Sequence, residues 1–184
     1  KLVRRFVPVT ADFHGQRRSN ETHVSTTDPE ARLMRKGSQQ EARLSFSGHL
    51  LTENRSGLIV DALLTPATGY AERDAALVLV DRQALGAGAT LGADKAYDTA
   101  AFVAALHERG VTAHVAQHTR GRRSAVPDAI ASTPGYALSQ RRRKLVEECF
   151  GWCKTVGASR KLRYLGIARN QHWFQMLAAG SMRA

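Results

Sequence analysis

Three side chains at helical spacing could do chemistry in one stretch of this sequence, residues 141–154. If the stretch is a helix, at about 100° per residue, Arg143, Glu147 and Lys154 fall within roughly 40° of one another. A carboxylate between two cations has two interpretations. It belongs to the solvated face of an amphipathic helix, or it is a catalytic acid whose cationic neighbours hold phosphate groups. The spacing alone leaves both interpretations open.

The opposite arc of the same stretch is apolar and is centred more than about 120° away from the charged residues. It is formed by Leu145, Val146, Cys149, Trp152 and Cys153. Because an apolar arc packs on a core, we expect Trp152 to serve packing and both thiols to be buried. A zinc site would need two more ligands, and no nearby His or Cys pair has the usual spacing. Two free thiols fit a reducing compartment such as the cytosol.

A second candidate carboxylate, Asp94, follows the short apolar run 89–93. A run of this length fits a buried strand, and catalytic groups in α/β sheets collect at the carboxyl ends of strands. The alternative is that Asp94 only caps a turn or a helix. Asp98 is expected to cap the helix that begins near Thr99.

The chain is strongly basic, and its charge is unevenly distributed. Its 184 residues carry a net charge of +11, with a pI of about 10.5. Residues 120–163 hold eleven Lys or Arg and only three acidic residues. Such a cluster beside a candidate site favours nucleic acid as the partner over an anionic membrane surface. RNA binding has less support because no aromatic stacking platform is found, and no apolar run approaches the ~20 residues of a membrane span.

The elements that must position these residues follow from hydrophobic periodicity. We predict a hairpin of strands at 43–53 and 58–65, a helix at 71–85, a strand at 89–93, a helix at 99–109, a strand at 111–116, a basic loop at 118–123, an irregular segment from there to residue 135, the charged helix at 141–154 and a helix around 172–179. This order of elements suits an α/β domain with a mixed sheet.

The chain divides into two regions by composition. Residues 1–42 are polar and are expected to be largely irregular, with a short basic strand or tail at 1–7, whereas residues 43–184 carry the predicted domain. His14 and His23 lie in the polar region, where isolated histidines are expected to be neither ligands nor catalysts.

The charged stretch resembles the Y-x-x-R-x-x-x-E-x-x-x-x-x-x-K signature of bacterial insertion-sequence transposases of the DDE type. The flanking sequences are similar as well, at 134–140 (Pro-Gly-Tyr-Ala-Leu-Ser-Gln), at 148–154 and at 160–161. Residues 93–98 resemble the family's A-D-K-G-Y-D motif, and stretches at 12–23 and 25–33 are also similar to the family. Two departures stand out. Gln140 occupies the position of the signature Tyr, and Ala96 replaces a Gly.

The resemblance implies a fold, a reaction and a set of site residues. The fold is a ribonuclease H-like mixed sheet flanked by helices. Asp94 and Glu147 become catalytic carboxylates that hold Mg²⁺, or Mn²⁺, for strand cleavage and transfer. The DNA-binding cations are expected to be Arg141, Arg142, Arg143, Lys154, Arg160 and Lys161. The partners are double-stranded DNA, as terminal inverted repeats and target DNA, and further copies of the chain, in the bacterial cytoplasm and without a membrane.

The resemblance also implies a third carboxylate, on a first strand that precedes the matched motifs. This sequence has no Asp before Asp12. Asp61 lies on a predicted strand and is a weak candidate for the third carboxylate, because it matches a different position of the family. We therefore expect a transposase that lacks its N-terminal part and first strand, binds DNA and cleaves it poorly. The alternative is a non-catalytic DNA-binding remnant.

Overall fold

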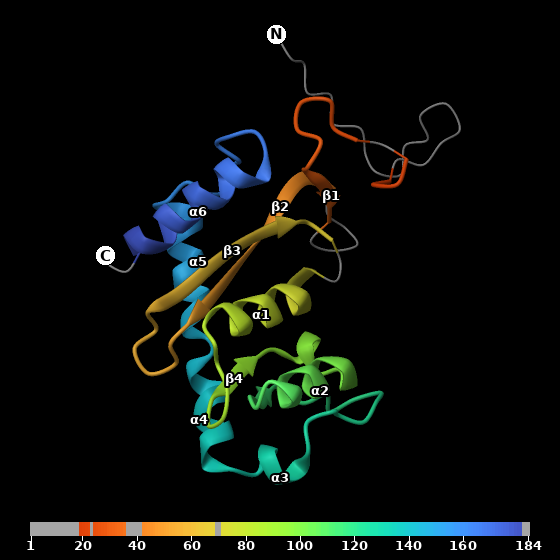
Figure 1. Cartoon of the computed structure of the whole chain (residues 1–184), viewed down its shortest axis with the longest axis vertical. Helices are drawn as coiled ribbons and strands as arrows, with labels where there is room; N and C mark the ends of the chain where they lie inside the picture. Colours follow the sequence, from red (N-terminus) through yellow and green to blue (C-terminus); the bar gives the residue numbers. More distant parts are fainter. Residues whose placement is uncertain (1–18, 23, 36–41, 69–70, 182–184) are drawn as a thin grey trace.

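The structure, a computed structural model, describes residues 19–22, 24–35, 42–68 and 71–181 (Figure 1). The sequence predictions for residues 1–7, Asp12, His14 and His23 lie outside these residues. The elements are β1 (Arg32–Met34), β2 (Arg43–Thr52), β3 (Ile59–Pro66), α1 (Ala71–Arg82), β4 (Thr90–Ala93), a 3₁₀ turn η1 (Lys95–Tyr97), α2 (Ala100–Glu108), β5 (Thr112–Val115), α3 (Asp128–Ala131), α4 (Pro134–Arg142), α5 (Leu145–Thr155) and α6 (Ile167–Ser181).

The described strands form two sheets. β1, β2 and β3 make an antiparallel sheet in that order, and β4 pairs with β5 in parallel. The predicted hairpin is confirmed, and so are the helix–strand–helix–strand elements that follow it, within three residues at each end. The predicted single mixed sheet was wrong for the described residues, because no ladder there joins the antiparallel sheet to the parallel pair.

Helix α1 lies between the two sheets, and α6 covers β3 (Figure 1). Gly48 on β2 makes room for α6, because a Cβ added there would lie 2.9 Å from Cζ of Phe174. Phe174 is thereby buried against the hairpin in a small core with Ile59, Ala62 and Ala178.

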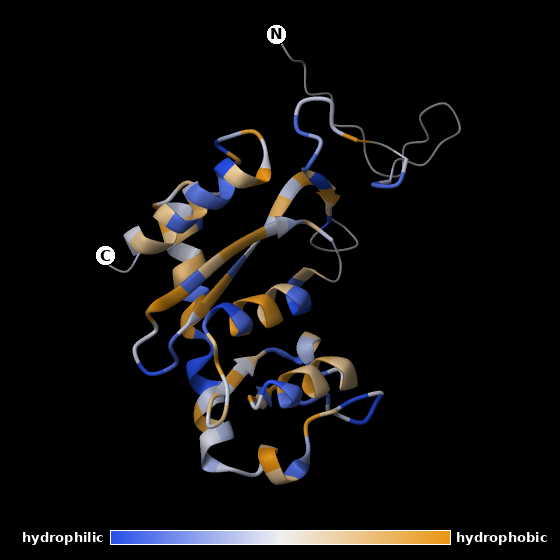
Figure 2. Ribbon diagram, in the orientation of Figure 1, coloured by the Kyte–Doolittle hydropathy of each residue, from blue (hydrophilic) through white to orange (hydrophobic). Residues whose placement is uncertain are grey.

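The larger core belongs to the parallel pair. Its buried members are Val80, Leu91, Phe102, Leu106, Val111, Ala113, Val115 and Val126. Leu51 of β2 packs against this cluster, so the hairpin and the parallel pair are held together through side chains rather than through a shared ladder. The colouring by hydropathy shows apolar residues along β3 and on α2 (Figure 2).

The predicted helix at 141–154 is two helices joined end to end. α4 begins at Pro134 and ends at Arg142, and α5 begins at Leu145. Arg143 and Lys144 lie between them, with backbone angles that stay in the right-handed helical region. α4 starts earlier than predicted because Thr133 caps it, accepting a hydrogen bond from the backbone of Tyr136, and because proline suits the first turn of a helix. The short helix α3 was also not predicted.

Side-chain contacts hold the described part of the polar region before the hairpin. β1 forms where an irregular segment was predicted. The Asn20 side chain binds Leu33, the middle residue of β1. Its amide nitrogen donates to the Leu33 carbonyl at 3.0 Å, and its amide oxygen accepts from the Leu33 N–H at 2.7 Å.

Candidate functional site

Asp94 lies directly after β4, as predicted from the apolar run. Its side chain is exposed, and Oδ1 accepts a hydrogen bond of 2.7 Å from the N–H of Ala96. This bond caps the 3₁₀ turn η1, so the capping role that the sequence analysis gave as the alternative for Asp94 is confirmed. Capping occupies one carboxylate oxygen and leaves the side chain at the carboxyl edge of the parallel sheet.

Glu147 lies in the first turn of α5 and is exposed, as is Lys154 in its last turn. Lys154 Nζ lies 5.4 Å from the centre of the Phe150 ring, within cation–π range. Residues 143 and 144, between α4 and α5, keep right-handed helical backbone angles.

The opposite arc of α5 packs as predicted. Cys153 is buried, Cys149 is half-buried, and burial raises the pKa of both thiols. The Trp152 ring packs on α6, where a Cβ added to Gly180 would meet it at 3.4 Å. Cys149 packs against the small core and Cys153 is buried, and the raised pKa favours the protonated, unreactive thiol at neutral pH.

Helix α4 packs on the strand that leads to Asp94. A Cβ added to Gly92, on β4, would lie 3.6 Å from Cβ of Arg143 and 3.7 Å from the carbonyl oxygen of Ser139. Arg143 therefore lies beside β4, two residues before Asp94. No hydrogen bond or ion pair joins Asp94 to Glu147 among the described residues.

Gln140, which the sequence analysis named only as a departure from the transposase signature, contacts Arg143. Its Nε2 donates to the carbonyl of His114 on β5, and its Oε1 accepts a 2.9 Å hydrogen bond from Nε of Arg143. The amide thus joins the sheet to the guanidinium. The available signal was the three-residue spacing of Gln140 and Arg143, which places them on neighbouring positions of a helix surface.

A buried polar cluster fixes α4 against both sheets. His114 Nδ1 lies 2.8 Å from the buried Ser139 hydroxyl, and Asn54 in the hairpin turn donates to the same oxygen at 3.4 Å. Burial lowers the pKa of His114. The neutral imidazole and the hydroxyl therefore satisfy each other inside the molecule, and the sequence carried no signal for this pairing.

Asp98 does not cap α2, so that prediction was wrong. Thr99 caps the helix instead, its Oγ1 accepting a 3.3 Å hydrogen bond from the N–H of Phe102. The Asp98 side chain is buried at 1% exposure and turns toward the segment that follows β5. Thr99 occupies the capping position because its hydroxyl is one residue closer to the first turn of α2.

The match to known proteins decides what this arrangement belongs to. Residues 21–182 match the family model of the transposase DDE domain. The chain belongs to this transposase family. No curated protein and no solved structure matches it. The match runs from the polar segment before β1 to the end of α6 and therefore includes both candidate carboxylates of the transposase domain and all six candidate DNA-binding cations.

The other predicted DNA-binding residues of the transposase domain lie on its surface. Arg141 and Arg142 are exposed in the last turn of α4, and Arg142 donates to the carbonyl of Arg55 at 3.2 Å. Arg160 and Lys161 are exposed in the loop between α5 and α6. Exposure leaves their charged groups accessible to a ligand.

Asp61, the weaker candidate for a third carboxylate, lies beside the end of α1. Asp61 accepts a hydrogen bond from the Gln83 side chain at 3.3 Å and lies 3.9 Å from Arg82, so it is engaged with the end of α1. Within the described part of the chain, no group of three or more His, Cys, Asp and Glu side chains is placed to hold a metal ion.

No helix in that part is long and apolar enough to span a bilayer.

Proposed function

We propose that this chain binds double-stranded DNA and that Asp94 and Glu147 are two carboxylates of a metal-dependent site for DNA strand cleavage and transfer. The packing of α4 on β4 carries the proposal, because it brings Arg143 of the transposase signature beside the strand that directly precedes Asp94. The parallel β4–β5 pair and the antiparallel hairpin are compatible with a ribonuclease H-like arrangement.

The donor chemistry of the two carboxylates fits a hard divalent cation. Asp94 and Glu147 are both exposed and offer oxygen atoms, the ligands that Mg²⁺ prefers together with water and substrate oxygens; Mn²⁺ takes the same ligands. When bound, such ions activate the attacking hydroxyl and stabilise the departing oxygen. The contribution of Arg143 is to position DNA, since its planar fork suits a phosphate, whereas Lys154 offers a single point charge.

The reaction implies partners and a location. Terminal repeats and target DNA must meet in one assembly, so we propose that at least two copies of the chain act together on DNA in the bacterial cytoplasm. The clustered positive charge between residues 120 and 163 supports DNA as the partner.

A non-catalytic DNA-binding remnant is the second candidate. It is favoured by one observation: the described residues bring together no group of three potential metal ligands. In this case the basic surface would retain DNA affinity, whereas cleavage would be lost.

Substitution of each carboxylate tests the proposal. We expect Glu147→Gln and Asp94→Asn to lower metal-dependent nicking of supercoiled plasmid by about 100-fold or more, the scale seen when a group that stabilises transition-state charge is removed. DNA affinity should stay within about twofold, because neither carboxylate attracts phosphate. Calorimetry of Mn²⁺ binding gives a second readout, in which Asp94→Asn should bind the ion more weakly.

The neighbouring carboxylate provides the matched control. Glu148 is also exposed in the first turn of α5, so Glu148→Gln removes the same charge one residue away. Equal nicking by the Glu147 and Glu148 variants would reject the catalytic assignment. A parent protein that binds DNA tightly and never nicks it would establish the remnant instead.

A further inference from the structure

We propose that residues 117–126 form a second phosphate-binding surface for DNA and that Asp98 is the residue that positions it. This inference rests on the proposed DNA-binding function and adds a surface that the transposase signature does not include. The segment, here called the arginine loop, contains Arg120, Arg122 and Arg123 and no acidic residue. All three arginines are exposed.

The arginine loop lies at the same sheet edge as Asp94. β4 and β5 are parallel neighbours, so the segments that follow them leave the sheet side by side. The ladder continues to the start of the loop, because the N–H of Ala116 donates to the carbonyl of Ala93 at 3.0 Å. Ala93 immediately precedes Asp94. A DNA strand that reached Asp94 would therefore pass near the arginine loop.

A buried carboxylate holds the loop from beneath. Asp98 accepts hydrogen bonds from the N–H of His118 at 2.7 Å on one oxygen and from the N–H of Ala125 at 2.8 Å on the other. The Arg122 guanidinium donates to the backbone carbonyl of Asp98. The two ends of the loop are thus tied to one side chain, which is 1% exposed.

The ionised state of Asp98 is maintained by these contacts. Burial by itself would raise the pKa of Asp98, but the backbone N–H groups of His118 and Ala125, the Ser124 hydroxyl and the charge of Arg122 outweigh it and lower the pKa below its usual value. A buried carboxylate is stable only when it is bonded in this way. The loop conformation and the charge of Asp98 therefore depend on each other.

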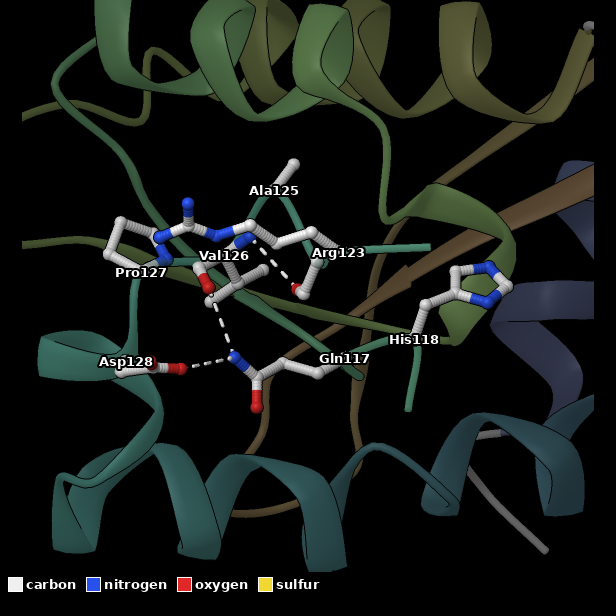
Figure 3. A pocket seen from close by; sticks show the side chains of 8 residues that line it. Gln117, His118, Arg123, Ala125, Val126, Pro127 and Asp128 are labelled. Atoms are coloured by element: carbon white, nitrogen blue, oxygen red, sulfur yellow. Dashed lines mark hydrogen bonds between the residues drawn. The ribbon is translucent and has the colours of Figure 1, made fainter. Parts of the chain in front are cut away.

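The base of the loop is anchored in the core, whereas its tip is free to contact a ligand. Figure 3 shows Gln117 reaching across to Val126 and Asp128, with hydrogen bonds of 3.0 and 3.3 Å. Val126 is buried in the larger core. Gly121 turns the tip with a φ of +82°, a conformation that L side chains rarely adopt. Anchoring fixes the arginines relative to Asp94.

The composition of the tip favours DNA over an anionic membrane. Residues 118–124 contain no large apolar side chain (His-Thr-Arg-Gly-Arg-Arg-Ser). Binding at a membrane surface normally adds apolar insertion to electrostatic attraction. A purely polar, arginine-rich tip instead matches the phosphate backbone of nucleic acid, which guanidinium groups contact in a bidentate manner.

The salt dependence of DNA binding tests the surface. The variant is Arg120→Ala combined with Arg123→Ala, which leaves Arg122 in its contact with Asp98. Each lost phosphate contact lowers the slope of log K against log salt by about 0.9, so we expect a slope smaller by up to about two, measured by fluorescence anisotropy between 50 and 200 mM salt. The control, Arg82→Ala with Arg169→Ala, removes the same charge from α1 and α6 and should leave most of the slope.

Asp98→Asn tests the positioning role. Its shape is retained, but its amide group cannot accept from both loop N–H groups. We expect faster amide hydrogen exchange at His118 and Ala125, an unchanged helical circular dichroism signal and a slope lowered toward that of the arginine variant. Added to the arginine variant, Asp98→Asn should lower the slope further by at most about 0.9, because Arg122 is the one arginine of the loop that this variant retains.

The outcomes separate this inference from the proposed function. An unchanged slope in the arginine variant overturns the second surface, even if Arg143→Ala lowers the slope by about one. If the parent chain binds no DNA at low salt, the proposed function fails as well. If the arginine variant loses affinity for phosphatidylserine vesicles but not for DNA, the surface belongs to a membrane and the inference is wrong.

Discussion

Gln140 and Arg143 form one unit at the scale of single residues. The Gln140 amide uses its nitrogen on the β5 backbone and its oxygen on Nε of Arg143. No hydrogen bond engages the two terminal nitrogens of the guanidinium within the described part of the chain, and the Gln140 contact ties the orientation of the guanidinium to the sheet. Preorganisation of this kind reduces the entropy that binding must remove. The residue that departs from the transposase signature therefore has a definite structural role.

The test at this scale is Gln140→Leu. We expect DNA affinity to fall by about threefold to tenfold, since a hydrogen bond of this type contributes about 1 kcal/mol, and the salt slope to decrease by up to about one. Gln175→Leu makes the same chemical change on an exposed part of α6 and serves as the control. Equal affinities for the two variants would show that Arg143 does not need Gln140.

At the scale of elements, the hairpin contains a buried titratable group. His49 lies on β2 at 8% exposure, and its Nε2 is 2.8 Å from the Thr65 hydroxyl on β3. Burial disfavours the charged imidazolium and lowers the pKa of His49 to about 4. In the unfolded chain the pKa is about 6.5. The unfolded state therefore binds more protons between pH 6.5 and 4, and the folded hairpin loses stability as the pH falls through this window.

His49→Gln should flatten that dependence. From pH 7 to pH 4 we expect the parent to lose about 2–3 kcal/mol more of its free energy of unfolding than the variant, because one unit of pKa difference corresponds to about 1.4 kcal/mol. Urea unfolding at a series of fixed pH values measures this difference in the free energy of unfolding. A residual slope is expected from His114, whose pKa is lowered in the same direction. His172→Gln changes an exposed histidine and should track the parent; identical curves for all three proteins would disprove the role of His49.

At the scale of the whole molecule, the segment before β1 closes onto the last helix. Asp28 Oδ2 accepts from the N–H of Gly166 at 3.1 Å, and Glu30 Oε2 accepts from the N–H of Ile167 at 2.9 Å. These donors are among the free N–H groups at the start of α6, where negative charge is favourable. Gly166 permits the approach, since its φ is +81° and an added Cβ would lie 3.1 Å from the Glu30 carboxylate.

The expected boundary at residue 42 remains a prediction based on composition.

Asp28→Ala should lower the free energy of unfolding by about 1–2 kcal/mol, the usual effect of losing a helix-capping side chain. Asp28→Ser should lose less of the free energy of unfolding than Asp28→Ala, because a hydroxyl can still accept the hydrogen bond. Glu108→Ala removes an exposed carboxylate from the opposite end of a helix, where its charge is unfavourable, and should not destabilise. Denaturation by urea compares the four proteins. A neutral Asp28→Ala would mean that α6 does not depend on this contact.

The sequence by itself determined the hairpin and the helices and strands that follow it as far as β5. The hairpin, α1, α2, β4 and β5 follow from local periodicity and turn residues, which act over a few positions. The placement of Asp94 after a strand followed from the same pattern. That Arg143, Glu147 and Lys154 share one face stays a prediction: Glu147 and Lys154 are exposed, whereas Arg143 is half-buried beside β4.

Only the tertiary structure decided which polar groups meet. Asp98 bonds to the arginine loop, Gln140 to β5 and Asp28 to the start of α6, across separations of 20 to 138 residues. Each contact satisfies a buried or terminal polar group that requires a partner. A sequence shows that such a group exists, but the partner is chosen by how distant segments pack. The division of the strands into two sheets has the same origin, because the pairing of a strand edge is a long-range contact without a local signal.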